Sequence, residues 1–136
     1  MTKLNIDINS FSYKKGYPKD NSGNGGGFAF DCRGIYNPGR IEQYKTLSGL
    51  DLAVQNFLIN ETEMPNFLKS IYEIISINIE NYISRGFEHL QINFGCTGGQ
   101  HRSVFAAEQT VKFLKERYKD INITINHNNQ ENWVKP

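Results

Sequence analysis

The sequence of 136 residues predicts a single α/β domain in which a mostly parallel or mixed sheet is flanked by helices. Two observations predict this class. Several segments alternate between apolar and polar residues, as strands do, and others carry apolar residues at helical spacing. In addition, strands and helices alternate along the second half of the chain, and the order strand, helix, strand over residues 89–125 indicates a right-handed parallel crossover.

The first part of the chain predicts two strands separated by a loop. Residues 4–8 alternate between apolar and polar side chains, which indicates a strand. Residues 22–27 (Ser-Gly-Asn-Gly-Gly-Gly) hold four glycines, and we expect a flexible loop there because glycine has the largest backbone freedom. Residues 28–32 (Phe-Ala-Phe-Asp-Cys) indicate a short buried strand, and residues 37–39 (Asn-Pro-Gly) indicate a turn.

Two helices are predicted in the middle of the chain. Residues 48–51 (Ser-Gly-Leu-Asp) have the spacing of a capping box with Asp in place of Glu, so a short helix is expected there. A longer helix is expected over residues 65–84, with Gly86 at its end. The expected apolar faces comprise Leu50, Val54, Phe57 and Leu58 in the first helix, and Leu68, Ile71, Ile75, Ile79, Tyr82 and Ile83 in the second.

The last part of the chain predicts a strand, a helix and a strand. Residues 89–94 alternate again, and residues 103–118 give the clearest helical pattern of the sequence. Residues 121–125 alternate as a last strand, and a polar tail follows at residues 126–136. Residues 1–136 are therefore expected to form one domain with one flexible glycine-rich loop and one polar tail.

Composition and charge exclude several classes of protein. The chain has 15 Lys and Arg against 14 Asp and Glu, and a net charge of +1 argues against a protein that mainly coats nucleic acid or membrane. Two cysteines are too few for a disulfide framework, and the three histidines have no zinc-site spacing, so we expect no metal and no cofactor. The sequence shows neither a membrane span nor a signal peptide, which predicts a cytoplasmic protein.

The most informative segment is the loop at residues 95–103, which reads Gly-Cys-Thr-Gly-Gly-Gln-His-Arg-Ser between a predicted strand and a predicted helix. Its glycines allow N–H groups to turn inward, and the start of the helix adds free N–H donors and the positive end of a dipole. Arg102 and His101 add side-chain donors. Together these features predict an anion site, in particular for phosphate. The alternative is a tight turn whose glycines serve geometry only.

A catalytic interpretation of this loop is also open. Cys96, five further residues, Arg102 and Ser103 match the Cys-x5-Arg-Ser/Thr loop of cysteine-dependent phosphatases. In that chemistry the thiolate attacks phosphorus and the arginine holds the phosphate oxygens. However, Gly95 stands where those enzymes have a histidine. No separate segment indicates a general-acid loop, although Asp31 and Asp51 are candidates for the general acid. The alternative for Cys96 is a packed thiol.

Two charged residues follow the predicted strand at residues 28–32. Ligands of open α/β sheets bind beyond the carboxyl ends of the strands, where Asp31 and Arg33 are expected. Arg33 is suited to contact a phosphate oxygen, and Asp31 is suited to accept a hydrogen bond from a sugar hydroxyl or an ammonium group. The alternative is a structural ion pair between the two side chains.

The loop closely resembles a segment of the C-terminal domain of the RapZ family of RNase adapter proteins. The resemblance covers about residues 10–120 in the same order. It comprises Gly-Cys-Thr-Gly-Gly-Gln-His-Arg-Ser-Val at 95–104, Ala-Glu-Gln at 107–109, Ser-Phe-Ser-Tyr-Lys-Lys-Gly at 10–16, Phe-Asp-Cys-Arg at 30–33, Asn-Pro at 37–38 and Leu-Ser-Gly-Leu-Asp at 47–51. The sequence lacks the Gly-x4-Gly-Lys-Ser/Thr of the family's N-terminal NTPase domain, so the resemblance is to a stand-alone C-terminal domain.

The resemblance implies a fold similar to that of sugar-phosphate enzymes, binding of glucosamine-6-phosphate, self-association into a homo-oligomer, and contact with small regulatory RNA. We therefore expect a non-catalytic sensor of a phosphorylated amino sugar, with regulation through a protein partner or a small RNA. The expected ligand-binding residues are Asp31, Arg33, Asn37, Cys96, Thr97, Gly98, Gly99, Gln100, His101, Arg102 and Ser103.

Three departures from the family pattern affect this expectation, and one of them is the glycine-rich loop at residues 22–27, which is longer than its family counterpart. The family has a histidine directly after Asn-Pro, and this chain has Gly39, so the contact of that imidazole must be lost or replaced. The family's tail is strongly basic, whereas residues 126–136 contain one lysine. Phosphate contacts supply most RNA affinity, and one lysine cannot recreate a polycationic arm, which argues against strong RNA binding.

Overall fold

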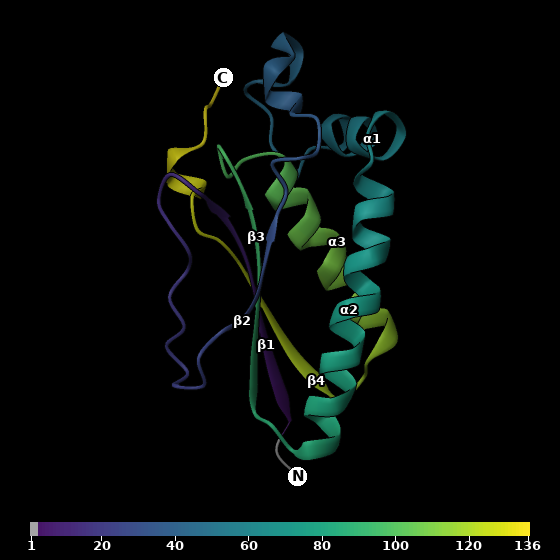
Figure 1. Ribbon diagram of the computed structural model, residues 1–136. Coiled ribbons are helices and arrows are strands. Elements are labelled where there is room, and N and C mark those ends of the chain that lie inside the picture. Colours follow the sequence, from purple (N-terminus) through teal and green to yellow (C-terminus); the bar gives the residue numbers. More distant parts are fainter. Residues whose placement is uncertain (1–2) are drawn as a thin grey trace.

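The computed structural model describes residues 3–136 as an α/β fold, which confirms the predicted class (Figure 1). The elements are β1 (Leu4–Ser12), β2 (Gly27–Asp31), α1 (Leu52–Glu61), α2 (Met64–Arg85), β3 (His89–Cys96), α3 (Arg102–Arg117) and β4 (Ile121–His127). Three short 3₁₀ helices accompany them: η1 (Pro38–Arg40), η2 (Glu42–Tyr44) and η3 (Gln130–Asn132).

The four strands form one sheet in the order β2-β3-β1-β4, and every neighbouring pair is parallel. The predicted crossover from β3 through α3 to β4 is thus parallel, but β4 lies beyond β1 rather than beside β3. In the register, Ser12 lies opposite Cys96, and Asp31 lies opposite Gly95. The carboxyl ends of β1, β2 and β3 therefore meet at one end of the sheet.

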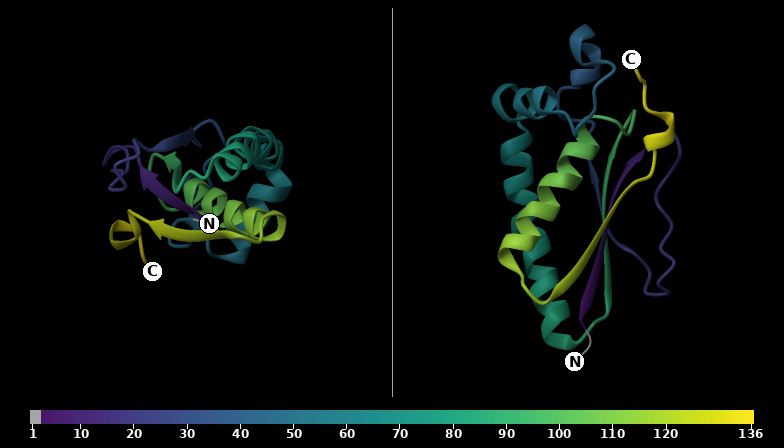
Figure 2. Two further views of the ribbon diagram at one scale, coloured as in Figure 1. Left: turned by 90° about the horizontal axis from the view of Figure 1, so that it is seen from below. Right: turned by 180° about the vertical axis from the view of Figure 1, so that it is seen from behind.

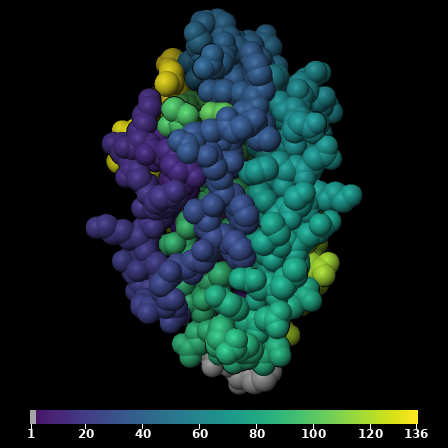
Figure 3. Space-filling model, viewed as in Figure 1, coloured from purple at the N-terminus to yellow at the C-terminus, as the bar shows by residue number. Residues whose placement is uncertain are grey.

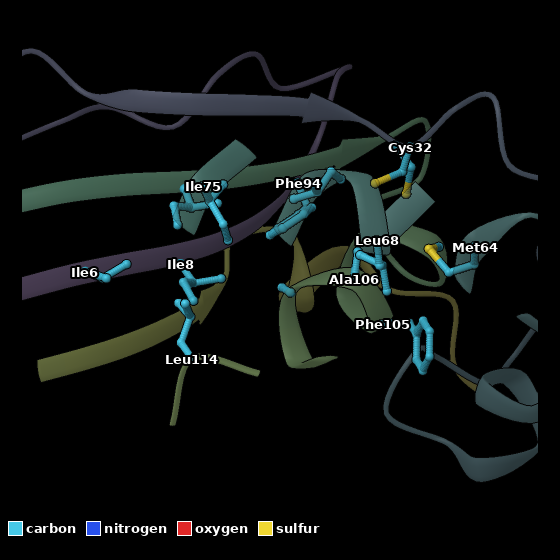
Figure 4. Packing of buried hydrophobic residues seen from close by; sticks show 14 of the residues in the cluster. Ile6, Ile8, Cys32, Met64, Leu68, Ile75, Phe94, Phe105, Ala106 and Leu114 are labelled. Atoms are coloured by element: carbon cyan, nitrogen blue, oxygen red, sulfur yellow. The ribbon is translucent and has the colours of Figure 1, made fainter. Parts of the chain in front are cut away.

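The hydrophobic core lies between one face of the sheet and the helices, which all lie on the same side (Figure 2). Ile6 and Ile8 of β1 and Phe94 of β3 are fully buried against Ile75 of α2 and Leu114 of α3 (Figure 4). Burying a side chain of this size stabilises a fold by about 1.5–3 kcal/mol. The apolar residues of the strands and helices recur periodically in the sequence because both kinds of element pack against this one core.

The other face of the sheet carries polar side chains. Asn93 lies at its centre, where its Nδ2 donates to Gln91 Oε1 at 3.0 Å and its Oδ1 accepts from Asn9 Nδ2 at 2.9 Å. The segment before β2 crosses this face, and Gln91 Nε2 donates to the carbonyl of Lys19 at 3.1 Å. Parallel sheets are usually covered on both faces and read as continuous apolar runs. Within residues 3–136 no helix covers the second face, which explains why the strands alternate.

The predicted glycine-rich loop is organised by one carboxylate. Asp20 accepts hydrogen bonds from the N–H and hydroxyl of Ser22, at 3.0 and 2.7 Å, and from the N–H of Gly26 at 2.5 Å. These bonds, those from Ser22 foremost, lower the pKa of Asp20 to about 2. Gly25 and Gly26 have positive φ, as their position in a tight turn requires, whereas Gly27 is the first residue of β2.

Two predictions about the first half of the chain need correction. The strand at residues 28–32 was expected to be buried, but β2 is an edge strand in which exposed residues alternate with half-buried Phe28 and Phe30. In the described part of the chain, β2 pairs with β3 alone and no helix covers its outer face. Leu50 was expected on a helical face, but it is 45% exposed because α1 begins at Leu52. Only one half of the expected capping box forms, since the Asp51 carboxylate accepts from Ser48 N at 2.8 Å while Ser48 Oγ accepts from Leu50 N at 3.1 Å, and the N-cap residue of α1 is Asp51 rather than Ser48.

The ends of the later elements agree closely with the sequence pattern. Gly86, at φ +71°, ends α2 in the left-handed conformation expected of a C-terminal glycine. Ile83, expected on the buried face, is instead 44% exposed in the last turn of that helix. Residues 126 and 127 of the predicted tail belong to β4, and η3 follows. No helix within residues 3–136 combines the length and apolar character that crossing a membrane requires.

Candidate anion site at the start of helix α3

Residues 97–101 form a loop that leads from the end of β3 into α3. The loop lies at the end of the sheet where the C-terminus and η1 also lie (Figure 1). Gly99 adopts φ +61°, and a Cβ built there would lie 3.0 Å from the N atom of Ser12 and 3.0 Å from Asn129 Cβ. Glycine is therefore required at this position both for its backbone conformation and for the close approach of β1.

Four consecutive carbonyl groups of this loop are held by donors from other parts of the chain. Ser12 Oγ donates to Thr97 O at 2.6 Å, Asn129 Nδ2 to Gly98 O at 2.8 Å, Trp133 Nε1 to Gly99 O at 2.7 Å, and Gly49 N to Gln100 O at 2.9 Å. Gly49 comes so close to α3 that a Cβ there would lie 2.5 Å from His101 O. The carbonyl side of the loop is thus fully engaged by its surroundings.

The backbone N–H groups of the same loop differ from its carbonyl groups in their hydrogen bonding. Within residues 3–136, the N–H groups of residues 97–104 donate no hydrogen bond to the protein. The last three of these begin α3, where the first N–H groups of a helix have no partner in the helix and carry its positive dipole end. A loop with its carbonyls engaged and its N–H groups free is complementary to an anion.

Arg102, the first residue of α3, is 95% buried, with a relative exposure of 5%. Its Nη1 donates to the carbonyls of Arg33 and Ile35, at 2.9 and 2.8 Å, and so ties α3 to the segment after β2. Its Nε is also buried, and within residues 3–136 it has no hydrogen-bond partner. A buried guanidinium N–H without a partner costs free energy, which an anionic ligand would recover.

A cavity of about 260 Å³ lies beside this loop. Six of the predicted ligand-binding residues line it, namely Asn37, Cys96, Gly98, Gln100, His101 and Arg102. Three further lining residues are Gly39, Lys45 and Val134. Lys45 and Val134 were not among the predicted residues, because neither belongs to a motif and only the fold brings them to the loop. Lys45 adds a second cation to the lining, and its ammonium group also pairs with Glu42 at 2.8 Å.

The thiol of Cys96 is packed and hydrogen-bonded. Cys96 is 2% exposed, and its Sγ donates to Ser103 Oγ at 3.1 Å. Ser103 is itself fully buried in the first turn of α3. The second cysteine, Cys32, follows β2, and burial raises its pKa well above the ordinary value for a thiol.

His101 is a neutral imidazole with its proton directed away from Gly39. Its Nε2 lies 2.8 Å from the carbonyl of Tyr44, and since a carbonyl only accepts, Nε2 carries the proton. Burial lowers the pKa of His101 below the usual 6.5, so the ring is neutral at pH 7 and Nδ1 is an acceptor. A Cβ at Gly39 would lie 3.2 Å from Nδ1, so the missing histidine side chain leaves this nitrogen accessible from Gly39.

Asp31 and Arg33 form an ion pair outside the cavity lining. Arg33 donates to both carboxylate oxygens, at 2.9 and 2.8 Å, and its guanidinium stacks on Tyr13 at 3.8 Å from the ring centre. The side chains are 48% and 47% exposed, and the hydrogen bonds from Arg33 lower the pKa of Asp31. The structural alternative is therefore realised, and a contact with ligand stays a prediction.

Of the remaining predicted residues, some make hydrogen bonds within the protein and one is exposed at the surface. The side chain of Gln100 is fully engaged, because Nε2 donates to Leu47 O at 2.7 Å and to Val134 O at 3.1 Å while Oε1 accepts from Val134 N at 2.8 Å. Asn37 Oδ1 accepts from Gly39 N at 2.8 Å and caps η1. Thr97 is exposed. Within residues 3–136, no group of three or more His, Cys, Asp and Glu side chains is placed to hold a metal ion.

Comparison with known proteins identifies the family. Residues 4–131 match the family model of the RapZ C-terminal domain. The chain belongs to this family. Among relatives named nucleotide-binding protein, one from Thermosipho melanesiensis is 40% identical over 119 residues, which are 88% of this chain and 41% of the relative. One from Cereibacter sphaeroides is 39% identical over 115 residues, or 85% and 36%, and one from Fusobacterium nucleatum is 36% identical over 130 residues, or 94% and 43%.

The RapZ-like chain spans about two fifths of the length of these relatives. The part that matches the family model includes the whole of the loop and its cavity lining up to residue 131. The name nucleotide-binding protein therefore refers to those longer chains.

Proposed function

We propose that this RapZ C-terminal domain binds the phosphate group of a small phosphorylated ligand at residues 97–104 and does not transform it. One observation carries the proposal: the carbonyls of the loop are engaged, whereas its N–H groups donate to no acceptor within residues 3–136. Arg102, whose Nε has no hydrogen-bond partner among the described residues, and Lys45 supply positive charge at the same cavity. Phosphate is the anion that best uses several convergent N–H donors and a guanidinium together.

The ligand class that fits best is a phosphorylated amino sugar such as glucosamine-6-phosphate. The cavity of about 260 Å³ is smaller than the ~300–1,000 Å³ of pockets for drug-sized ligands, which favours a sugar phosphate over a whole nucleotide. Neutral His101 offers an acceptor nitrogen, and Asn37 also lines the cavity. These groups suit the hydroxyl and ammonium donors of an amino sugar.

Binding without catalysis is supported by the chemistry of the lining. Nucleophilic attack by Cys96 needs a thiolate and a general acid for the leaving group. In the described part of the chain, the Cys96 thiol donates to Ser103, and the cavity lining contains no Asp or Glu. A role as sensor, through a protein partner or small RNA and in a homo-oligomer, extends the proposal on the strength of family membership.

A calorimetric titration tests the ligand. We expect glucosamine-6-phosphate to bind saturably and at least tenfold more tightly than glucose-6-phosphate, inorganic phosphate or ATP. Equal affinity for all of the phosphates would retain the anion site and overturn the amino-sugar assignment. No heat with any phosphate would overturn the site itself. Release of phosphate from an aryl phosphate, lost in Cys96→Ser, would instead establish the phosphatase alternative.

An arginine variant tests the place of binding. Arg102→Lys keeps the charge but loses the planar fork, so we expect at least a tenfold loss of affinity for glucosamine-6-phosphate. Arg117→Lys is the matched control, because Arg117 lies at the other end of α3 and pairs with Glu80 on the surface. Equal affinity of both variants would place the phosphate elsewhere. Circular dichroism of both variants checks that the fold is retained.

A further inference from the structure

We propose that residues 129–134, here called the strap, position the anion-binding loop and that their docking is coupled to ligand binding. This inference rests on the proposed function, since it concerns how the same site is held ready. The strap follows β4, contains η3, and ends beside the loop at the chain terminus. In Figure 3 the yellow C-terminal residues lie directly beside the green atoms of the chain near residue 100.

Four hydrogen bonds join the strap to three consecutive residues of the loop. Asn129 Nδ2 donates to Gly98 O at 2.8 Å, and Trp133 Nε1 donates to Gly99 O at 2.7 Å. The Gln100 side chain then pairs with both backbone groups of Val134, at 2.8 and 3.1 Å. Asn129 is 93% buried, with a relative exposure of 7%, and its Oδ1 accepts from Asn132 Nδ2 at 2.9 Å, which fixes the orientation of the amide.

These bonds decide the direction of the loop's N–H groups. A peptide group is planar and trans, so its C=O and the following N–H point in opposite directions. Holding the carbonyls of Gly98 and Gly99 on the strap therefore directs the N–H groups of Gly99 and Gln100 to the opposite side. Two successive glycines would otherwise allow these peptide groups to rotate, because glycine populates both signs of φ. Asn129 and Trp133 are thus positioning residues.

The strap also contributes directly to the cavity, because Val134 lines it. A ligand that binds the positioned loop more tightly than a released one must, by linkage, strengthen the docking of the strap by the same factor. Release of the strap must weaken ligand binding in turn. The end of this chain is therefore a regulatory element of the site and not a passive tail.

The experiment uses Trp133 as its own reporter, because it is the only tryptophan in the chain. Glucosamine-6-phosphate and inorganic phosphate are titrated into the wild-type protein, with binding measured by calorimetry and the emission of Trp133 recorded at each point. Coupling predicts a saturable emission change with the same midpoint as the heat. A purely structural tail predicts binding with constant emission, which overturns the coupling.

Two variants test the positioning role. Trp133→Phe keeps an aromatic ring but loses the N–H donor, and Asn129→Ala loses the amide donor; each is expected to weaken phosphate binding about fivefold, as loss of one net hydrogen bond does. Asn128→Ala is the matched control, since Asn128 is the exposed neighbour and should leave affinity unchanged.

The outcomes separate this inference from the proposed function. If the wild-type protein binds ligand and both variants bind it equally well, the positioning role of the strap is overturned while the proposed binding site is retained. If the wild-type protein binds neither probe, both the proposed function and the proposed role of the strap are overturned. If the variants lose thermal stability but keep wild-type affinity, the strap is a structural support only, and the positioning role is overturned.

Discussion

The loop at residues 20–26 and the loop at residues 97–101 both contain glycines of positive φ, yet they are held by different means. The first is organised from within, by the Asp20 carboxylate, which accepts from N–H groups and a hydroxyl of its own turn. The second is organised from outside, by donors from Ser12 of β1, from Gly49 and from the strap, which engage its carbonyls. Within residues 3–136, these segments accept no hydrogen bond from its backbone N–H groups.

The difference teaches which backbone groups a glycine-rich loop leaves available. In the first loop the carboxylate uses N–H groups, so the turn has fewer donors to offer to an anion. In the second loop the surroundings use the carbonyls, so the donors remain free. Glycine content alone indicates conformational freedom, whereas the neighbouring side chains determine what the loop is able to bind.

The largest effect is expected from removing the buried guanidinium that anchors the second loop. Arg102→Met leaves the carbonyls of Arg33 and Ile35 without their donor, and we expect a loss of about 2–4 kcal/mol in the free energy of unfolding together with loss of phosphate binding. Urea unfolding and calorimetry measure the two effects. Arg33→Met is the comparison, because its half-exposed ion pair should contribute only about 0–1 kcal/mol. Similar losses in both variants would contradict the assignment of Arg102 as the anchor.

Matched alanine substitutions sharpen the comparison of the two loops. Gly99 and Gly25 both have positive φ, but a Cβ at Gly99 meets Ser12 N at 3.0 Å, whereas a Cβ at Gly25 meets nothing within 4 Å. We expect Gly25→Ala to cost about 1 kcal/mol from backbone strain alone, and Gly99→Ala to cost more, roughly 2–3 kcal/mol, and to abolish ligand binding. Chemical unfolding measures both variants. Equal costs would show that packing around Gly99 is unimportant.

Most elements of the fold could be predicted from the sequence because one side of the sheet is covered and the other is polar. Ile6 and Ile8 alternate with polar residues for this reason, and Ile75 and Ile79 follow the helical period against the same layer. The sheet order could not be predicted, since pairing β4 with β1 joins segments more than 100 residues apart without any local signal. The burial of the strand at residues 28–32 was misjudged, because its sequence contains no mark of an edge position.

The candidate site could be predicted only in part. The loop at residues 97–103 was found through its motif, since the residues that form it are contiguous. Lys45 and Val134 reach the cavity only through the tertiary fold, and no local pattern distinguishes them. The tail appeared merely polar, yet Asn129 and Trp133 bind two loop carbonyls. Sequence patterns report residue type, whereas these roles depend on which atoms the fold brings within bonding distance.

A pH titration separates the two loops by their ionisable groups. Burial lowers the pKa of His101, so the unfolded chain takes up a proton near pH 6.5 while the folded chain does not. Stability must therefore fall as pH decreases below 6.5, and above that pH the contribution is constant. His101→Gln keeps an N–H donor for the Tyr44 carbonyl and cannot titrate, so we expect a flatter profile between pH 7.5 and 5. Thermal unfolding across this range checks it, and an unchanged slope would assign the titration to another group.

The smallest effect is expected at Asp20, whose pKa is lowered to about 2 by the hydrogen bonds from Ser22. A depressed carboxylate pKa contributes stability above the unfolded value near 3.9, and this contribution is lost as pH falls through about 2. The first loop should thus loosen only in strong acid, well below the range that affects His101. Asp20→Ala should speed hydrogen exchange of Ser22 and Gly26 at neutral pH and lower the unfolding midpoint slightly, while leaving ligand affinity unchanged. Reduced affinity in this variant would join the two loops functionally and remove the contrast between them.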